Sequence, residues 1–239
     1  MAERNTSEHL APTRPGILTG LKAEVKFLRP AFPHAAIAAS GATSAGAQRE
    51  TARLIATGPD CLLSFGLAAG LDPALPPGTV IVPQAVHAWG ETFECDPDLR
   101  HILGATRPDC YGGTLLHSDD VVLEATEKAR LFAETQCASL DMESGFMARQ
   151  AREAGIPFAV LRVVCDPATR SLPAAAGCVL SPKGGLKIGA LLASLARNPS
   201  QIAGLIALGG DAARARKAMQ QFLDRQRTVQ AFMRLASGN

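Results

Sequence analysis

The chain has 239 residues, of which 47% are hydrophobic and 19% charged, and its formal net charge is +2. This apolar content excludes a mainly disordered protein, and the small charge argues against a polyanionic partner such as nucleic acid. Aromatic residues make up only 5% of the chain, so a stacking platform for single-stranded nucleic acid is not expected. The positive charge belongs to the C-terminal part, because residues 211–239 hold six basic and two acidic side chains.

The N-terminal sequence and the cysteines indicate a cytoplasmic protein. Residues 1–10 are polar and charged and lack the apolar stretch of a secretion signal, and the long uncharged segments contain prolines that exclude a membrane-spanning helix. No cysteine pair has the spacing of a metal site, and several cysteines lie in apolar runs. Free thiols in a reducing compartment are therefore expected for Cys61, Cys95, Cys110, Cys137, Cys165 and Cys178.

Short apolar strands alternate with alanine-rich helical patterns through most of the chain. This alternation predicts an α/β fold with a mixed or mostly parallel sheet. The first predicted helix covers residues 21–29 and is ended by Pro30. In chain order, the predicted strands cover 16–20, 35–39, 61–65, 78–82, 114–117, 137–141 and 158–165. The other predicted helices of this part cover 44–56, 121–134 and 142–154.

Beyond residue 182 the pattern is wholly helical. We therefore predict an α/β domain over residues 14–197 and a C-terminal helical extension over residues 198–239. Asn198-Pro199 and Gly209-Gly210 are expected to separate three helices in this part of the chain. These helices are predicted over 183–197, 200–208 and 211–235.

The last predicted helix is basic and amphipathic. Such a helix can lie on the anionic inner face of a membrane, or it can pack on the body of the protein or on a second subunit. The two apolar helices before it could cover a site and receive a lipid tail, or they could form ordinary core. The sequence leaves these alternatives open. The apolar face of the last helix holds Met219, Phe222, Gln226, Val229 and Met233.

Candidate functional residues stand where predicted strands end, which is where open α/β sheets bind ligands. Glu24 lies in the first turns of a helix that follows a strand, where a carboxylate can act as a base on water or can be a plain helix-start charge. Ser40-Gly41 and the segment 66–70 are predicted to be glycine turns. Backbone N–H groups can converge there on an anion or a water, although many ordinary turns also contain glycine.

Two acidic residues, Glu143 and Asp166, follow the predicted strands 137–141 and 158–165. Arg162 lies inside the second of these strands, which is otherwise apolar. An unpaired buried arginine is costly, so we expect Arg162 to meet a carboxylate or a ligand. The first outcome can be a purely structural ion pair, and the second would mark a functional site.

Taken together, five motifs resemble the nucleoside phosphorylase and nucleosidase superfamily over about residues 14–196. They are Gly20-Leu-Lys-Ala-Glu24, Ser40-Gly41, Gly66-Leu-Ala-Ala-Gly70, Met142-Glu143 and Arg162-x-x-x-Asp166. Their order and spacing are most similar to methylthioadenosine/S-adenosylhomocysteine nucleosidases. Within the superfamily, the whole chain looks most like the hopanoid-associated phosphorylase branch. The resemblance implies a three-layer α/β/α fold with a central mixed sheet, and a homodimer or a larger homo-oligomer.

The resemblance also implies a role for each matched residue. Asp166 would protonate N7 of a purine, and Glu143 would accept hydrogen bonds from the ribose hydroxyls above Met142. Glu24, with Arg162 beside it, would activate the attacking water. The remaining implied binding residues, which would line the sugar, the nucleophile and the base, are Ser40, Gly41, Gly66, Ala68, Ala69 and Val122.

Two departures from the family pattern affect these expectations. The nucleosidases carry an aromatic residue near the position of Val121, so stacking on the purine would come from elsewhere, such as Phe65 or Trp89. Hexameric phosphorylases place a phosphate-binding arginine near the position of Ser64, which argues against that phosphate site here. Water is therefore favoured over phosphate as the nucleophile.

The function implied by the resemblance is cleavage of the N-glycosidic bond of a purine nucleoside. For the hopanoid-associated branch this would be release of adenine from adenosylhopane in hopanoid biosynthesis. A soluble methylthioadenosine/S-adenosylhomocysteine-type nucleosidase and a purine nucleoside phosphorylase are alternatives, and so is a non-catalytic nucleoside-binding protein. No metal or organic cofactor is expected, and phosphate is the alternative co-substrate.

Overall fold

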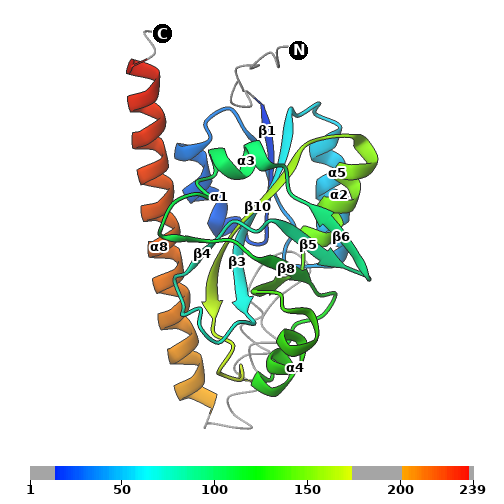
Figure 1. Ribbon diagram of the computed structural model, residues 1–239, viewed down its shortest axis with the longest axis vertical. Coiled ribbons are helices and arrows are strands. Elements are labelled where there is room, and N and C mark those ends of the chain that lie inside the picture. Colours follow the sequence, from blue (N-terminus) through cyan, green and yellow to red (C-terminus); the bar gives the residue numbers. More distant parts are fainter. Residues whose placement is uncertain (1–13, 174–200, 237–239) are drawn as a thin grey trace, which may run out of the picture.

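The structure, a computed structural model, describes residues 14–173 and 201–236 (Figure 1). Its strands are β1 (Pro15–Thr19), β2 (Ala36–Ala39), β3 (Cys61–Gly70), β4 (Val80–Ile81), β5 (Ala85–Ala88), β6 (Glu91–Glu94), β7 (Cys110–Tyr111), β8 (Thr114–His117), β9 (Ser139–Asp141) and β10 (Phe158–Asp166). Its helices are α1 (Lys22–Ala31), α2 (Ser44–Ile55), α3 (Pro97–Ile102), α4 (Ala125–Thr135), α5 (Ser144–Ala154) and α8 (Gln201–Ala236).

All the strands belong to one mixed sheet, in which β3 is central. The order is β6-β5-β8-β9-β3-β10-β4-β7, and β1 pairs with the first half of β3 and with β2. β1, β3 and β10 run parallel, so their carboxyl ends lie at the same edge. The register aligns Arg162 with Gly66 and Asp166 with Ala69. Residues from distant parts of the sequence therefore meet at this edge.

Helices cover both faces of the sheet, which gives the predicted three-layer α/β/α arrangement. In Figure 1, α2 and α5 lie on one face, and α1 and α8 lie on the other. The α5 core, between the sheet and α2 and α5, includes Leu18, Ala47, Leu54, Leu62, Phe146, Met147 and Val160. The α8 core, on the opposite face, includes Ile17, Leu28, Phe65, Leu99, Leu161, Val163, Met219 and Phe222.

Several boundaries differ from the prediction, and the ends of α1 and β3 have clear physical reasons. α1 continues through Pro30 to Ala31, because a proline in the last turn sacrifices only one backbone hydrogen bond before the helix ends. β3 continues to Gly70 in place of the predicted turn over 66–70, because β9 and β10 pair with it on both sides. The elements β5, β6, β7 and α3 were not predicted, since their sequences are short and lack a clear period.

The C-terminal helix α8 is continuous through Gly209-Gly210, so the predicted break there is wrong. Two helical glycines cost about 1 kcal/mol each relative to alanine, and burial of Met219 and Phe222 in the α8 core offsets this. The sequence left open whether this helix lies on a membrane, on the body of the protein or on a second subunit. For Met219 and Phe222, the structure shows packing on the body of the protein. Three of the predictions for this region fall outside what the structure describes. They concern the helix over 183–197, the domain boundary after residue 197, and the side chains of Gln226, Val229 and Met233. Among the described residues, no helix is long and apolar enough to cross a bilayer.

The two glycines of α8 provide a test of its continuity. Both are exposed, both have helical backbone conformations, and a Cβ built on either meets no atom within 4 Å. We expect Gly209→Ala and Gly210→Ala each to raise the free energy of unfolding by about 0.5–1 kcal/mol. Urea unfolding measures this change, with Gly155→Ala as the control, because Gly155 has φ +65° and should lose stability instead. No gain in the two α8 variants would contradict a continuous helix.

Candidate functional site

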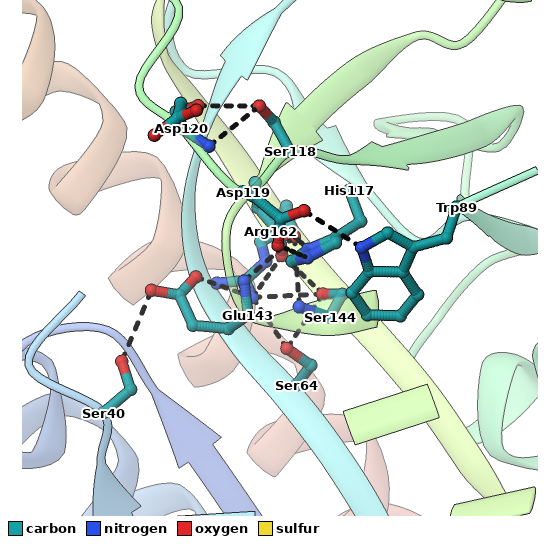
Figure 2. Close-up of polar contacts among 11 residues, drawn as sticks. Ser40, Ser64, Trp89, His117, Ser118, Asp119, Asp120, Glu143, Ser144 and Arg162 are labelled. Carbon is teal, nitrogen blue, oxygen red and sulfur yellow. Dashed lines mark hydrogen bonds and ion pairs between the residues drawn. The ribbon is translucent and has the colours of Figure 1, made fainter. Parts of the chain in front are cut away.

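Arg162, in the middle of β10, is the centre of a buried polar cluster (Figure 2). Only 1% of its side chain is exposed. Its guanidinium forms an ion pair with Asp141 and lies 3.5 Å from Oε2 of Glu143. It also donates a hydrogen bond of 2.6 Å to the Ser64 hydroxyl. The buried arginine thus meets carboxylates, as its desolvation cost requires, and Ser64 helps to hold it in place.

Asp141 ends β9 and Glu143 directly precedes α5, and their pKa values move in opposite directions. Burial acts to raise the pKa of Asp141, but the charge of Arg162, the adjacent His117 ring and a hydrogen bond from Ser144 outweigh it and hold the pKa at about 2. Burial raises the pKa of Glu143 to about 7, against the charge of Arg162 and together with the negative charges of Asp141 and Glu24. Asp141 is therefore a fixed anion at neutral pH, whereas Glu143 can gain or lose a proton.

Two glycines leave the space in which these side chains converge. A Cβ built on Gly66 would lie 2.4 Å from Nη1 of Arg162 and 3.3 Å from Oε1 of Glu24. A Cβ built on Gly20 would lie 3.2 Å from Oε1 of Glu143 and 3.7 Å from Oε2 of Glu24. Glu24, Glu143 and Arg162 therefore come together over these two positions, although they are far apart in the sequence.

Backbone and hydroxyl groups fix the two glutamates. Glu24 is buried, and its Oε2 accepts hydrogen bonds from the Thr19 hydroxyl and, at 2.9 Å, from the backbone N–H of Leu21. The Ser40 hydroxyl donates to Oε1 of Glu143 at 3.3 Å. Gly41 has φ +76° and donates its N–H to the carbonyl of Gly20, which ties the turn after β2 to the end of β1. The structure thus brings Ser40 and Gly41 to the same cluster.

Asp166, at the end of β10, lies in a second buried polar group. Its Oδ2 accepts a hydrogen bond of 2.7 Å from Nζ of Lys128, whereas its Oδ1 is buried and has no hydrogen-bond partner among the residues that the structure describes. Burial raises the pKa of Asp166, and the adjacent Lys128 opposes that shift. Among the described residues, no hydrogen bond or ion pair joins Asp166 to Arg162, although both lie on β10.

Lys128 and Asp141 are the residues that the sequence reasoning did not assign to the site. Lys128 is fully buried, yet a lysine in a helix is usually read as a solvated charge. A signal was present: Lys128 stands three and four residues before Leu131 and Phe132, which puts it on the apolar face of α4. Asp141 precedes the motif Met142-Glu143 and could have been chosen as the partner of Arg162 by the same desolvation argument.

The remaining predicted residues are placed less closely around the carboxylates. Ala68 is buried, and Met142 is half-buried beside Glu143. Ala69 and Val122 pack against the apolar residues under α4, namely Leu71, Leu116, Cys137 and Leu140.

Phe65 cannot supply base stacking as suggested, because strand alternation turns it away from Gly66 and into the α8 core. Trp89, the other suggested residue, packs against His117 and Phe146 with ring centroids 4.7 and 5.0 Å away. Its Nε1 donates to Asp119 at 3.0 Å (Figure 2). Trp89 is 40% exposed, so part of its surface can still be reached from solvent.

The described cysteines are free thiols, as expected. Cys165 is the one next to the site, since it directly precedes Asp166. Burial raises the pKa of the Cys165 thiol to about 12, and it does the same for Cys61 and Cys95. These thiols are therefore neutral at physiological pH. Cys178 lies outside the described residues.

Several solved structures share this fold. The 5'-methylthioadenosine/S-adenosylhomocysteine nucleosidase of Helicobacter pylori with butyl-thio-DADMe-Immucillin-A has a TM-score of 0.61 at 17% identity, covering 89% of this chain and 98% of that one. The Neisseria meningitidis nucleosidase in complex with methylthio-immucillin-A has a TM-score of 0.62 at 18% identity, covering 88% and 98%. Futalosine hydrolase of H. pylori has a TM-score of 0.62 at 18% identity, covering 89% and 97%.

A comparison with curated proteins gave no match. A protein-family model does match: residues 34–177 fit the model of the phosphorylase superfamily. The matched segment is more than half of the chain, and it contains Ser40, Glu143, Arg162 and Asp166. Asp141 and Glu143 beside Arg162, together with the buried acid Asp166, thus lie within the matched region, whereas Glu24 precedes it, and the chain belongs to the phosphorylase superfamily.

Proposed function

We propose that the protein cleaves the N-glycosidic bond of a purine nucleoside and releases the free base. The observation that carries the proposal is the state of Asp166, whose Oδ1 is buried and has no hydrogen-bond partner among the described residues. A buried oxygen without a partner costs free energy unless a ligand or a proton satisfies it. The raised pKa of Asp166 favours the protonated form, which can donate to N7 of a purine.

The second polar group suits the sugar. Bond cleavage builds positive charge at C1' of the ribose, and buried carboxylates stabilise such a centre. Glu143 would accept hydrogen bonds from the 2'- and 3'-hydroxyls, with Met142 packed under the ring. Ser40 holds Glu143 from the other side. In this arrangement the C1'–N9 bond breaks as the base takes up the proton of Asp166.

We further propose that water is the nucleophile. Glu24, fixed by Thr19 and Leu21, would orient the water and take its proton as the oxygen bonds to C1'. The guanidinium of Arg162 is already engaged by Asp141, Glu143 and Ser64, which disfavours a phosphate in its place. The similar folds of enzymes named nucleosidases and a hydrolase are consistent with this choice.

For the substrate we propose adenosylhopane, on the resemblance of the chain to the hopanoid-associated branch. The exposed residues Arg216, Lys217 and Arg225 of α8 would face an anionic membrane that holds such a lipid. This contact would use charge, since Met219 and Phe222 are buried in the α8 core. Methylthioadenosine, a soluble nucleoside, is the alternative.

The proposal is tested by measuring adenine release chromatographically from adenosylhopane in anionic vesicles and from methylthioadenosine. Each reaction is run with and without phosphate. Release from adenosylhopane without phosphate, with free ribose on the lipid, supports all parts of the proposal. Release only with phosphate, yielding a ribose 1-phosphate, replaces water by phosphate. Release from methylthioadenosine alone replaces the lipid substrate, and no release of a base from either compound rejects the proposed cleavage for both substrates.

The pKa of Glu143 gives the binding step a pH dependence. Hydroxyl groups of the ribose donate to the ionised carboxylate, and burial raises the pKa of Glu143 to about 7. Affinity for an uncleavable purine nucleoside analogue should therefore increase as the pH rises from 6 to 8, by up to about 10-fold. Calorimetric titration measures this change. Glu143→Gln should bind more weakly and lose the dependence, and an unchanged pH dependence in that variant would contradict the assignment.

A further inference from the structure

The helix α4 contacts the rest of the protein through an unusual residue. Lys128 is the one buried residue among the described side chains of α4, and its relative exposure is 0%. A buried ammonium is strongly unfavourable unless hydrogen bonds and an opposite charge compensate it. An apolar side chain on this face of α4 would avoid that cost, so the presence of lysine calls for a reason other than packing.

All the donors of Lys128 point to the segment that carries Asp166. Nζ donates at 2.7 Å to Oδ2 of Asp166, at 3.2 Å to the carbonyl of Pro167 and at 2.9 Å to the carbonyl of Arg170. These three bonds use the full donor capacity of an ammonium group. The lysine therefore fixes both the carboxylate and the backbone that follows it.

The two oxygens of Asp166 are thereby made unequal. Oδ2 is occupied by Lys128, and Oδ1 is buried without a partner in the described part of the chain. Because Lys128 engages only Oδ2, it leaves Oδ1 as the atom that can carry a proton and meet a ligand.

We propose that Lys128 is a positioning residue for Asp166: it holds Oδ2 and presents Oδ1 to N7 of the purine. This inference rests on the proposed function, because it takes Asp166 as the acid of the cleavage. Lys128 itself touches no reacting atom. Its ammonium also stabilises the ionised carboxylate, so it limits the pH range over which Asp166 keeps its proton.

A second ion-pair group holds the same segment from the other side. The guanidinium of Arg170, whose carbonyl accepts from Lys128, pairs with Asp211 of α8, and Asp211 also pairs with Arg214. Asp211 is 1% exposed. The segment 166–170 is thus bound both by Lys128 of α4 and by Asp211 of α8. The pair with Asp211 holds Arg170, whose carbonyl is one of the acceptors of Lys128.

The test compares the wild type with Lys128→Met, Asp166→Asn and the double variant. Adenine release is measured from the nucleoside that the wild type cleaves, between pH 5 and 9. We expect Lys128→Met to lower kcat by about 10²-fold with a small change in KM. Its activity should persist to higher pH than that of the wild type, because the carboxyl of Asp166 no longer has an ammonium beside it. Lys26→Met, at an exposed lysine of α1, serves as the matched control and should leave kcat and the pH profile unchanged.

The double variant separates positioning from a general structural effect. If Lys128 acts through Asp166, adding Lys128→Met to Asp166→Asn should cause little further loss of kcat. Lys128→Gln, which keeps hydrogen-bond donors without the charge, covers the case in which the methionine variant does not fold. The proposal is overturned if the folded Lys128 variants keep the wild-type kcat and pH profile, or if the losses multiply. If Asp166→Asn itself is fully active, the proposed function fails instead.

Discussion

Replacing Asp166 by asparagine is expected to lower the rate of base release by about 10³-fold. Asparagine has nearly the same shape and can still hydrogen-bond to N7, but it has no proton to transfer to the departing purine. General acids typically contribute 10²- to 10⁴-fold to a rate. The measurement is kcat at saturating nucleoside, with released base determined by chromatography.

The matched control for this prediction is Asp98→Asn, an exposed aspartate in the first turn of α3, which should keep the wild-type kcat. The melting temperature of Asp166→Asn should fall, because the buried ammonium of Lys128 keeps its two carbonyl partners but loses its opposite charge, so kcat is compared at a temperature at which the variant is folded. A folded Asp166→Asn protein with full activity would exclude Asp166 as the acid.

Replacing Arg162 by methionine is expected to lower the free energy of unfolding by about 3–5 kcal/mol at neutral pH. Methionine fills much of the same volume, but it leaves Asp141 and Glu143 buried without their cation. Urea unfolding measures the loss. Arg53→Met is the control: the side chain of Arg53 is 74% exposed and pairs with Glu50, so its loss should stay within about 0.5 kcal/mol.

The deficit of Arg162→Met should also depend on pH. In the wild type, Arg162 holds the pKa of Asp141 at about 2, below its unfolded-state value of about 4. The stabilisation is therefore fully present above pH 4 and is lost as the pH falls through 2. In the variant, burial favours the protonated carboxyl, so the deficit should be smaller at pH 5 than at pH 8. An equal deficit at both pH values would contradict this account.

The sequence was most informative where one unfavourable free-energy term, such as the desolvation of a buried charge, demands a particular partner. A buried arginine in an apolar strand requires a carboxylate, and Arg162 does meet Asp141 and Glu143. The strand and helix periods likewise predicted the sheet and the helices that position these residues. The structure also placed Glu24 and Ser40 in that cluster, which a resemblance between motifs had implied.

Elements that depend on contacts between distant residues were not predictable in this way. Gly209-Gly210 is a breaker by local propensity, and only the packing of α8 on the sheet keeps the helix intact. The segment 66–70 contains turn-forming glycines, yet strands on both sides extend β3 through it. The apolar face of α4 could have indicated that Lys128 is buried, but its partner Asp166 is 38 residues away and could not be identified from the sequence.

The packing of α8 also bears on the order in which the protein is completed during synthesis. Nascent chains emerge at about 5–20 residues per second and fold from the N-terminus, so β10 leaves the ribosome before α8. Until α8 docks, the sheet face around Phe65 and Leu161 lacks the part of its cover that Met219 and Phe222 supply, and Arg170 lacks Asp211. The ion pair that ties the segment after Asp166 to α8 can therefore form only once α8 has been made. This support of the segment beside the proposed acid is thus the last to be added, although Asp166 and Lys128 are synthesised earlier.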